Sequence, residues 1–346
     1  MHVLTSTAED DPAESFPSAA SVHRVIDDWT LSPGGRAALR RVDRLLRSEG
    51  VEIVHVLFPD SVLQARYQLP AAIGAGAIPL VTTFWNLGLG RRSPVAVKAE
   101  ALALLARSAA LTSHDPSYLG VLRRLAGWAK PVHWLPVGSS LDAPQLLDRQ
   151  AVRRRLALPG GRLVGFFGHL DFTRGAEELF EAVAILLRTQ DVRLLMIGSA
   201  GEARYGAYRQ AADRYGIAGA VDWTGYLPAR EAAEALRTVE VCVLPYRRNS
   251  LGRSALAAAL ELGVPTVLGG TRAGITPLRD GVHVALAPPQ DAAPLAATIA
   301  RVLGNEHERT RLGEGARRAA GLFAWPRIAA GALGLYRGVL AGPSRR

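Results

Sequence analysis

A glycine-rich loop at residues 168–175 has the residue types of a phosphate site. The segment GHLDFTRG follows an apolar run and precedes an amphipathic helical pattern that starts near Gly175. Glycines let a ligand approach the backbone closely, and a helix N-terminus with Arg174 beside it favours an anion. The loop therefore predicts a diphosphate site. The alternative is an ordinary strand–helix loop whose arginine faces solvent.

A second loop offers the same chemistry further along the chain. In LPYRRNSLGRSALAAALELGVP, residues 244–265, the side chains of Arg247, Arg248 and Arg253 surround Ser250 just before an alanine-rich helical segment. The cations and the helix N-terminus favour an anion here too. A well-packed helix with a basic entry loop is the alternative interpretation.

Both loops are expected at the ends of buried parallel strands, where ligands of open α/β sheets bind. Short, nearly continuous apolar runs are typical of such strands, because both faces of the sheet are covered. The runs lie at residues 2–6, 23–29, 51–58, 78–84, 132–136, 163–168, 192–198, 221–225, 239–245, 264–270 and 283–289.

Amphipathic helical patterns separate these runs. Between Glu177 and Arg188, apolar residues recur with the spacing of one helix face. The alternation of strands and helices predicts an α/β protein with two doubly wound, Rossmann-like domains. We expect the first domain at residues 1–145, the second at 146–324, and a C-terminal helix over 325–346 that packs back on the first domain.

The composition excludes several classes of protein. With 346 residues, 49% hydrophobic and 21% charged, the chain can bury two cores and is not disordered. No apolar run reaches the roughly 18 residues of a membrane span, and the N-terminal residues lack a signal-peptide pattern. Cys242 is the only cysteine, which excludes an intrachain disulfide and a cysteine-cluster metal site. These features predict a cytoplasmic protein.

The chain is basic, with a formal net charge of +10. Lys98 and Lys130 are the only lysines among 41 basic residues, an arginine bias typical of GC-rich bacterial genomes. Most of the excess charge lies in residues 151–346 and is compatible with a phosphorylated small molecule or with peripheral contact to the inner face of an anionic membrane. No nucleic-acid recognition motif occurs, so nucleic acid is not an expected partner.

The order and spacing of several weak motifs resemble family 4 retaining glycosyltransferases, which have the GT-B fold of two Rossmann-like domains facing a cleft. In the second half these motifs are VGFFGHLDFTRGAEELFEAV, LLMIGSAGE and VDWTGYLPAREAAEALRTVEVCVLPYRRNSLGRSALAAALELGVPTV. In the first half, VEIVHVLFPD, IPLVTTFWN and ALTSHDPSYLGVLRRL are similar to the acceptor domain. The resemblance covers nearly the whole chain.

The resemblance implies transfer of a sugar from a nucleoside-diphosphate sugar to an acceptor alcohol, with retention at the anomeric carbon. It implies no bound metal, because cations and a helix dipole stabilise the leaving diphosphate. It places Gly168, His169 and Arg174 at the diphosphate and Tyr226 beside the nucleotide base. No residue stands out as a covalent nucleophile, which fits a front-face mechanism.

Two departures concern residues of the family's site. The family's two motif glutamates fall on Ser250 and Ala258, so both carboxylates are missing. A serine-and-arginine version of this loop would contact the donor through Ser250, Arg253 and Ser254. A family histidine falls on Trp85, which together with His114 is expected on the acceptor side.

A third departure is at the beginning of the sequence. Met1 aligns with the middle of the family's second strand, so about one strand–helix unit is expected to be missing. A protein partner at the N-terminal sheet would cover the edge that this leaves. These departures keep a second interpretation open, a non-catalytic homologue that serves as an accessory or partner subunit.

Overall fold

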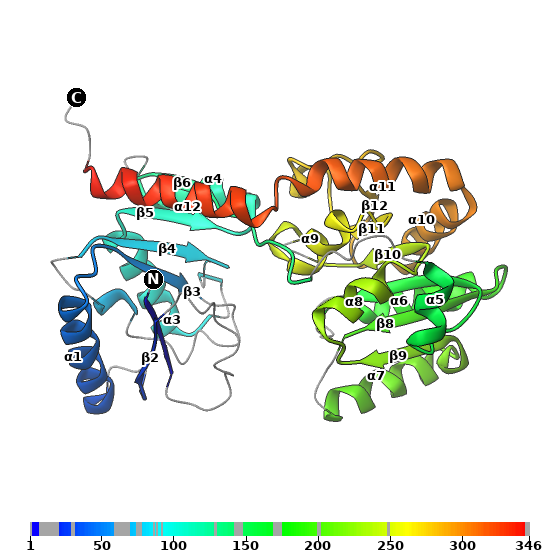
Figure 1. Cartoon of the computed structure of the whole chain (residues 1–346), viewed down its shortest axis with the longest axis horizontal. Coiled ribbons are helices and arrows are strands. Elements are labelled where there is room, and N and C mark those ends of the chain that lie inside the picture. The colour runs from blue at the N-terminus through cyan, green and yellow to red at the C-terminus, as the bar shows by residue number, and fades with distance from the viewer. Residues whose placement is uncertain are drawn as a thin grey trace. The chain divides into compact units, whose positions relative to one another are not determined.

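The computed structural model describes residues 2–6, 21–28, 32–58, 70–73, 78–85, 87, 89–90, 93–127, 130–141, 148–168, 175–198, 202–247 and 250–342 (Figure 1). The chain divides into two compact units. Unit 1 consists of Met1–Leu135 and Ala330–Arg346, and unit 2 is Pro136–Ala329. Helix α12 (Trp325–Leu340) contributes residues to both.

Unit 1 contains two parallel sheets. A four-stranded sheet has the order β3-β4-β5-β6, and β1 pairs with β2 in a separate two-stranded sheet. The strands are β1 (His2–Ser6), β2 (Ser21–Ile26), β3 (Val54–Phe58), β4 (Leu80–Phe84), β5 (Ala110–Ser113) and β6 (Val132–Trp134). The helices lying wholly in this unit are α1 (Pro33–Ser48), α3 (Val95–Arg107) and α4 (Leu119–Leu125).

Helix α1 shows how local sequence sets these elements. Ser32 is its N-cap, with a side-chain oxygen that accepts from the Gly35 N–H at 3.1 Å, and a proline follows at the first helical position. Ala38, Val42 and Leu46, spaced by four, form the buried stripe of the helix. This stripe belongs to a core shared with strands of both sheets.

Unit 2 contains a continuous six-stranded parallel sheet of order β12-β11-β10-β7-β8-β9. Its strands are β7 (Arg162–Phe167), β8 (Val192–Ile197), β9 (Val221–Gly225), β10 (Val241–Leu244), β11 (Thr266–Gly269) and β12 (Ala285–Ala287). Its helices are α5 (Arg149–Arg155), α6 (Ala176–Leu186), α7 (Glu202–Arg214), α8 (Ala229–Leu236), α9 (Ser254–Glu261), α10 (Ala292–Gly304) and α11 (Glu306–Ala320). Short 3-10 turns lie at Pro70–Ala72, Pro116–Tyr118, Ala218–Ala220, Ser250–Gly252 and Ala273–Ile275.

The α/β class with two Rossmann-like units is confirmed, and all six strands expected in the second half are present. Strand β5 was not among the expected strands, so the sequence prediction was wrong there. The C-terminal part of α12 packs on unit 1, where Leu335 joins a small cluster with Val81 and Ala110 of β4 and β5. Leu333 of the same helix is exposed.

Candidate functional site

The strand order of the second sheet reverses between β7 and β10. From β7 the chain moves outward through β8 to β9, then returns to β10 and continues through β11 to β12 on the other side. Ligands of open α/β sheets bind at the carboxyl ends of the strands beside such a reversal, because the two connections there diverge and leave a crevice. The segments that follow β7 and β10 are residues 168–175 and 245–253, the two loops expected to bind an anion.

Backbone segments at this edge of the sheet lie unusually close together, and glycines make this approach feasible. A Cβ at Gly175, whose φ is +82°, would lie 2.0 Å from the carbonyl oxygen of Pro245. A Cβ at Gly198 would lie 2.2 Å from the carbonyl oxygen of Gly168. The ends of β7, β8 and β10 therefore meet backbone to backbone at the start of helix α6.

Arg253 stands at the N-cap position of α9, and Ser254 is the first residue of that helix. The guanidinium carbon of Arg253 lies 5.7 Å from the centre of the Tyr246 ring, a cation–π contact. Its Nε is buried and has no hydrogen-bond partner among the residues that the structure describes. An unsatisfied buried N–H costs about 1–3 kcal/mol, and an anion at the first turn of α9 would satisfy it.

The other residues expected at the donor site lie as follows. Gly168 follows β7 directly, with a φ of +134°. Tyr226 follows β9 at the same edge of the sheet and is 78% exposed. Ser250 begins the 3-10 turn before α9, and its side chain lies outside the description. His169 and Arg174 lie outside the described residues.

Arg247, which the sequence prediction placed among the anion-binding cations, is instead committed to an ion pair. Its Nη2 lies 2.6 Å from Oε1 of Glu178 in the first turn of α6, and its Nε donates to the same oxygen at 2.8 Å. Arg247 is therefore paired with a protein carboxylate, contrary to the prediction that it faces an anion. The pair ties the loop after β10 to the helix that follows β7.

Helix α9 supplies no carboxylate where the resembling family has one. Ala258 is fully buried inside the helix. Glu261 lies at the last turn of α9 and is exposed. Glu261 lies three residues further along α9, so it does not replace the carboxylate that is missing at position 258.

Unit 1 brings together the two residues expected on the acceptor side. Trp85 follows β4 and His114 follows β5, and these neighbouring strands pair in register with Phe84 opposite Ser113. The two rings meet edge to face, with 5.0 Å between their centroids. Sequence reasoning named both residues but had no means of placing them side by side.

A hydrogen bond of the His114 ring sets which of its nitrogens carries the proton. Its Nδ1 lies 2.7 Å from the carbonyl oxygen of Leu135, which only accepts, so Nδ1 carries the proton. Burial lowers the pKa of His114, while this hydrogen bond opposes the shift. At neutral pH the ring is therefore neutral and its Nε2 is an acceptor.

His55, in strand β3, is a hydrogen-bonded histidine of the unit 1 interior. Its Nδ1 lies 2.6 Å from the Tyr336 hydroxyl and its Nε2 lies 2.6 Å from the Thr83 hydroxyl. Burial lowers its pKa to about 4, with a further contribution from His114. Both ring nitrogens of His55 are thus satisfied by hydroxyl groups of the protein.

The described part of the chain has neither a metal-ion cluster nor a membrane-spanning helix. Within it, no three His, Cys, Asp or Glu side chains are grouped so that they could hold a metal ion. No helix among the described residues is both long and apolar enough to cross a membrane.

The solved structures similar to this chain identify its fold. Sucrose-phosphate synthase from Thermosynechococcus elongatus superposes with a TM-score of 0.80 at 20% identity, covering 98% of this chain and 89% of that one. HepE of Anabaena in complex with UDP-glucose gives a TM-score of 0.74 at 18% identity, covering 92% and 86%. The chain thus has the GT-B glycosyltransferase fold.

The sequence comparisons indicate which glycosyltransferases the chain is similar to. Residues 161–305, most of unit 2, match the model of the family described as glycosyl transferases group 1. The D-inositol 3-phosphate glycosyltransferase of Geodermatophilus obscurus is 33% identical over 205 residues, which is 56% of this chain and 44% of that protein. That of Jonesia denitrificans is 29% identical over 245 residues, covering 66% and 57%. The chain spans about half the length of the curated relatives it matches. Unit 2 is therefore similar in sequence to the group 1 glycosyl transferases.

Proposed function

We propose that this protein transfers a sugar from a nucleoside-diphosphate sugar to an acceptor hydroxyl with retention at the anomeric carbon. The observation that carries the proposal is the reversal of strand order between β7 and β10, which brings together the ends of the two loops expected to bind an anion. The match of residues 161–305 to glycosyl transferases group 1 supports it. HepE, which shares the fold, has been crystallised with UDP and with UDP-glucose.

In this proposal the donor lies against unit 2. Gly168, His169 and Arg174 hold the diphosphate, because glycine lets the phosphate approach the backbone and the cations balance its charge. The nucleotide base lies beside Tyr226, whose exposed ring is available for stacking.

On the other side of the reversal, Arg253, Ser250 and Ser254 complete the contacts to the donor. The unsatisfied Nε of Arg253 and the first-turn N–H groups of α9 stabilise the negative charge that grows on the diphosphate as the glycosidic bond breaks. No bound metal is required. The departing phosphate removes the proton of the acceptor hydroxyl on the face that it leaves, so no side chain forms a covalent intermediate.

The acceptor side of the proposal lies in unit 1. Nε2 of the neutral His114 accepts a hydrogen bond from a sugar or alcohol hydroxyl. Trp85, edge to face with this imidazole, presents an indole face on which a sugar ring can stack.

A second candidate function is favoured by one observation. Because Ala258 is buried and carries no carboxylate, the chain lacks a group that the resembling enzymes place at the donor. A nucleotide-binding homologue without transfer activity would tolerate this loss and serve as a partner subunit. Such a protein would bind the nucleotide but would not turn it over.

The test is nucleotide binding followed by turnover. We expect UDP, GDP or ADP, at 100 times its Kd, to add about 2.7 kcal/mol to the free energy of unfolding. Arg253→Ala should remove most of that gain. Arg188→Ala, which removes an exposed arginine at the end of α6, is the matched control and should retain it.

Turnover is then assayed by release of the nucleoside diphosphate from its sugar conjugates, with and without EDTA. Equal activity in EDTA is the expected result for a metal-independent site. Binding without any turnover would select the partner subunit. If none of the nucleotides binds at millimolar concentration, the donor site is not where we place it.

A further inference from the structure

A pocket opens at the amino ends of β10 and β11, the edge of the second sheet opposite the two anion loops. Its volume is about 450 Å³, within the range of small-molecule sites. Val239 and the segment 263–265, which lead into the two strands, line it together with α11 and the ends of α5 and α8. The whole pocket belongs to unit 2.

Arginines outnumber carboxylates in the lining, four to three. Arginines reach the pocket from three helices or their caps, and carboxylates line it as well. The arginines are Arg149, Arg237, Arg309 and Arg317, and the carboxylates are Glu240, Glu306 and Glu314. The pairing of these carboxylates decides how much of the positive charge is left for a ligand.

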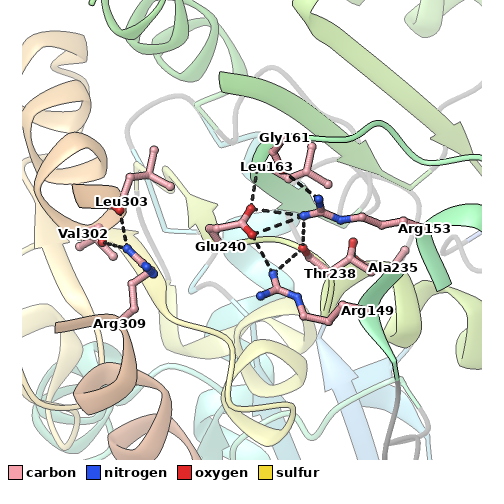
Figure 2. A network of polar contacts seen from close by, with 10 residues as sticks. All are labelled: Arg149, Arg153, Gly161, Leu163, Ala235, Thr238, Glu240, Val302, Leu303 and Arg309. Carbon is pink, nitrogen blue, oxygen red and sulfur yellow. Dashed lines mark hydrogen bonds and ion pairs between the residues drawn. The ribbon is translucent and has the colours of Figure 1, made fainter. Parts of the chain in front are cut away.

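Glu240 is fully engaged by groups of the protein (Figure 2). Its Oε2 accepts from the Leu163 N–H at 2.6 Å, and its Oε1 lies 3.1 Å from Nη2 of Arg149. Nη2 of Arg153 lies 3.4 Å from both carboxylate oxygens. One carboxylate thus faces two guanidinium groups, so this cluster retains a positive charge.

The two arginines of α11 that line the pocket, Arg309 and Arg317, keep their charge there. Arg309 donates through Nη1 to the carbonyl oxygens of Val302 and Leu303, so it caps the C-terminus of α10 and is held in place by neutral acceptors (Figure 2). Arg317 lies against Gly263, where a Cβ would come within 2.4 Å of its Nε. In the described part of the chain, Arg317 has no carboxylate within ion-pair distance.

The remaining carboxylates offset only part of this positive charge. Glu314 lies 3.9 Å from Arg318, one turn further along α11. Glu306 lies in the first turn of α11, where the helix dipole keeps it ionised, so it offsets the charge of one arginine. After these pairings, Arg309, Arg317 and the cluster around Glu240 still leave more positive than negative charge around the cavity.

We propose that this pocket binds a small anion of the phosphate-ester or diphosphate class. Arginine guanidinium groups have the planar, multidentate geometry that suits phosphate oxygens, and Arg309 is already fixed by its capping hydrogen bonds. The site is distinct from the donor site, because the two lie at opposite ends of the same parallel strands. The ligand therefore binds in addition to the nucleotide sugar and does not compete with it.

The experiment is calorimetric titration of the full chain with inorganic pyrophosphate in the presence of saturating UDP, which occupies the donor site. We expect Arg317→Ala to weaken pyrophosphate binding about tenfold, as loss of one charge-assisted contact does. Arg188→Ala, which removes an arginine outside the pocket, should leave the affinity unchanged. Both arginines are exposed, so neither change removes a core side chain.

The outcomes separate this pocket from other sources of binding. Loss of affinity in Arg317→Ala alone supports the pocket, whether or not the protein transfers a sugar. Equal affinity in all three proteins, or displacement of pyrophosphate by UDP, overturns it. Binding to phosphatidylglycerol vesicles without binding of free pyrophosphate would also overturn it, because the anion would then be a membrane surface.

Discussion

The sheets of the two units are held together by different kinds of contact. In unit 2 the core is almost entirely apolar, and glycines let neighbouring loops touch through their backbones. In unit 1 hydroxyl groups are buried between the strands. Thr82 and Ser108 are 2.8 Å apart, and the Ser113 hydroxyl donates to the Phe84 carbonyl oxygen at 2.9 Å.

This difference predicts which kind of perturbation destabilises each unit. Close steric contact is insensitive to pH but intolerant of added volume, since close-packed interiors do not yield. A buried polar network stabilises only while every group keeps its partner and its protonation state. We therefore expect added side-chain volume to destabilise unit 2 most, and protonation of buried groups to destabilise unit 1 most.

The largest effect is expected from Gly175→Ala in unit 2. The new Cβ would collide with the carbonyl oxygen of Pro245, and the residue has a φ of +82°. Overpacking and the left-handed backbone together should cost about 3 kcal/mol or more of the free energy of unfolding. Urea unfolding followed by hydrogen exchange of residues 162–198 measures the loss and assigns it to unit 2.

Gly216→Ala is the matched control for this prediction. Gly216 has a φ of +67° but no atom within 4 Å of an added Cβ, so only the backbone strain of about 1 kcal/mol applies. If both variants lose the same stability, the close contact between residue 175 and Pro245 contributes nothing beyond backbone strain.

The next effect concerns pH and His55 in unit 1. Its pKa is about 4 in the folded protein but near 6.5 when unfolded, so the unfolded chain takes up the proton first. The free energy of unfolding should therefore fall as the pH drops from 6.5 to 4, by up to about 3 kcal/mol. Urea unfolding of wild type and His55→Gln over this range measures it.

The comparison with His55→Gln is needed because Glu100 acts in the opposite sense. Burial raises the pKa of Glu100 to about 7, so its contribution to stability grows as the pH falls below that value. Glu100 is present in both proteins and cancels in the difference. Parallel pH profiles for wild type and variant would show that His55 carries none of the pH dependence.

The smallest effect is expected from Tyr336→Phe, which removes the hydroxyl bonded to His55. Loss of one hydrogen bond should cost about 1 kcal/mol, detected as faster hydrogen exchange in β3 and β4. Tyr205→Phe is the control in unit 2, where that hydroxyl donates to the Gly198 carbonyl oxygen at 2.6 Å. Its loss should be of similar size but should appear at β8.

The same contrast explains which strands could be predicted from sequence. The strands of unit 2 are runs of apolar residues, and each expected run was found. Strand β5, with the sequence ALTS, was missed because half of it is polar. Its Thr112 and Ser113 are buried against partners about thirty positions earlier, Thr83 and Phe84, and hydropathy does not register such partners.

For the candidate site, sequence predicted the loops but not their surroundings. Glycine and arginine content selected the segments after β7 and β10, because these residue types suit phosphate wherever the fold places them. The strand order that makes them neighbours depends on long-range pairing. For the same reason, the sequence did not reveal the ion pair of Arg247 with Glu178 or the ring contact of Trp85 with His114.

The hydrogen bond between His55 and Tyr336 also sets an order of events during protein synthesis. The two residues are 281 positions apart, with the whole of unit 2 encoded between them. At about 5–20 residues per second, a ribosome reaches the tyrosine codon roughly 15–60 s after it has passed the histidine codon. Throughout that interval the nascent β3 imidazole has only water in place of its partner. We therefore expect unit 2 to fold on the ribosome before unit 1 acquires its last helix.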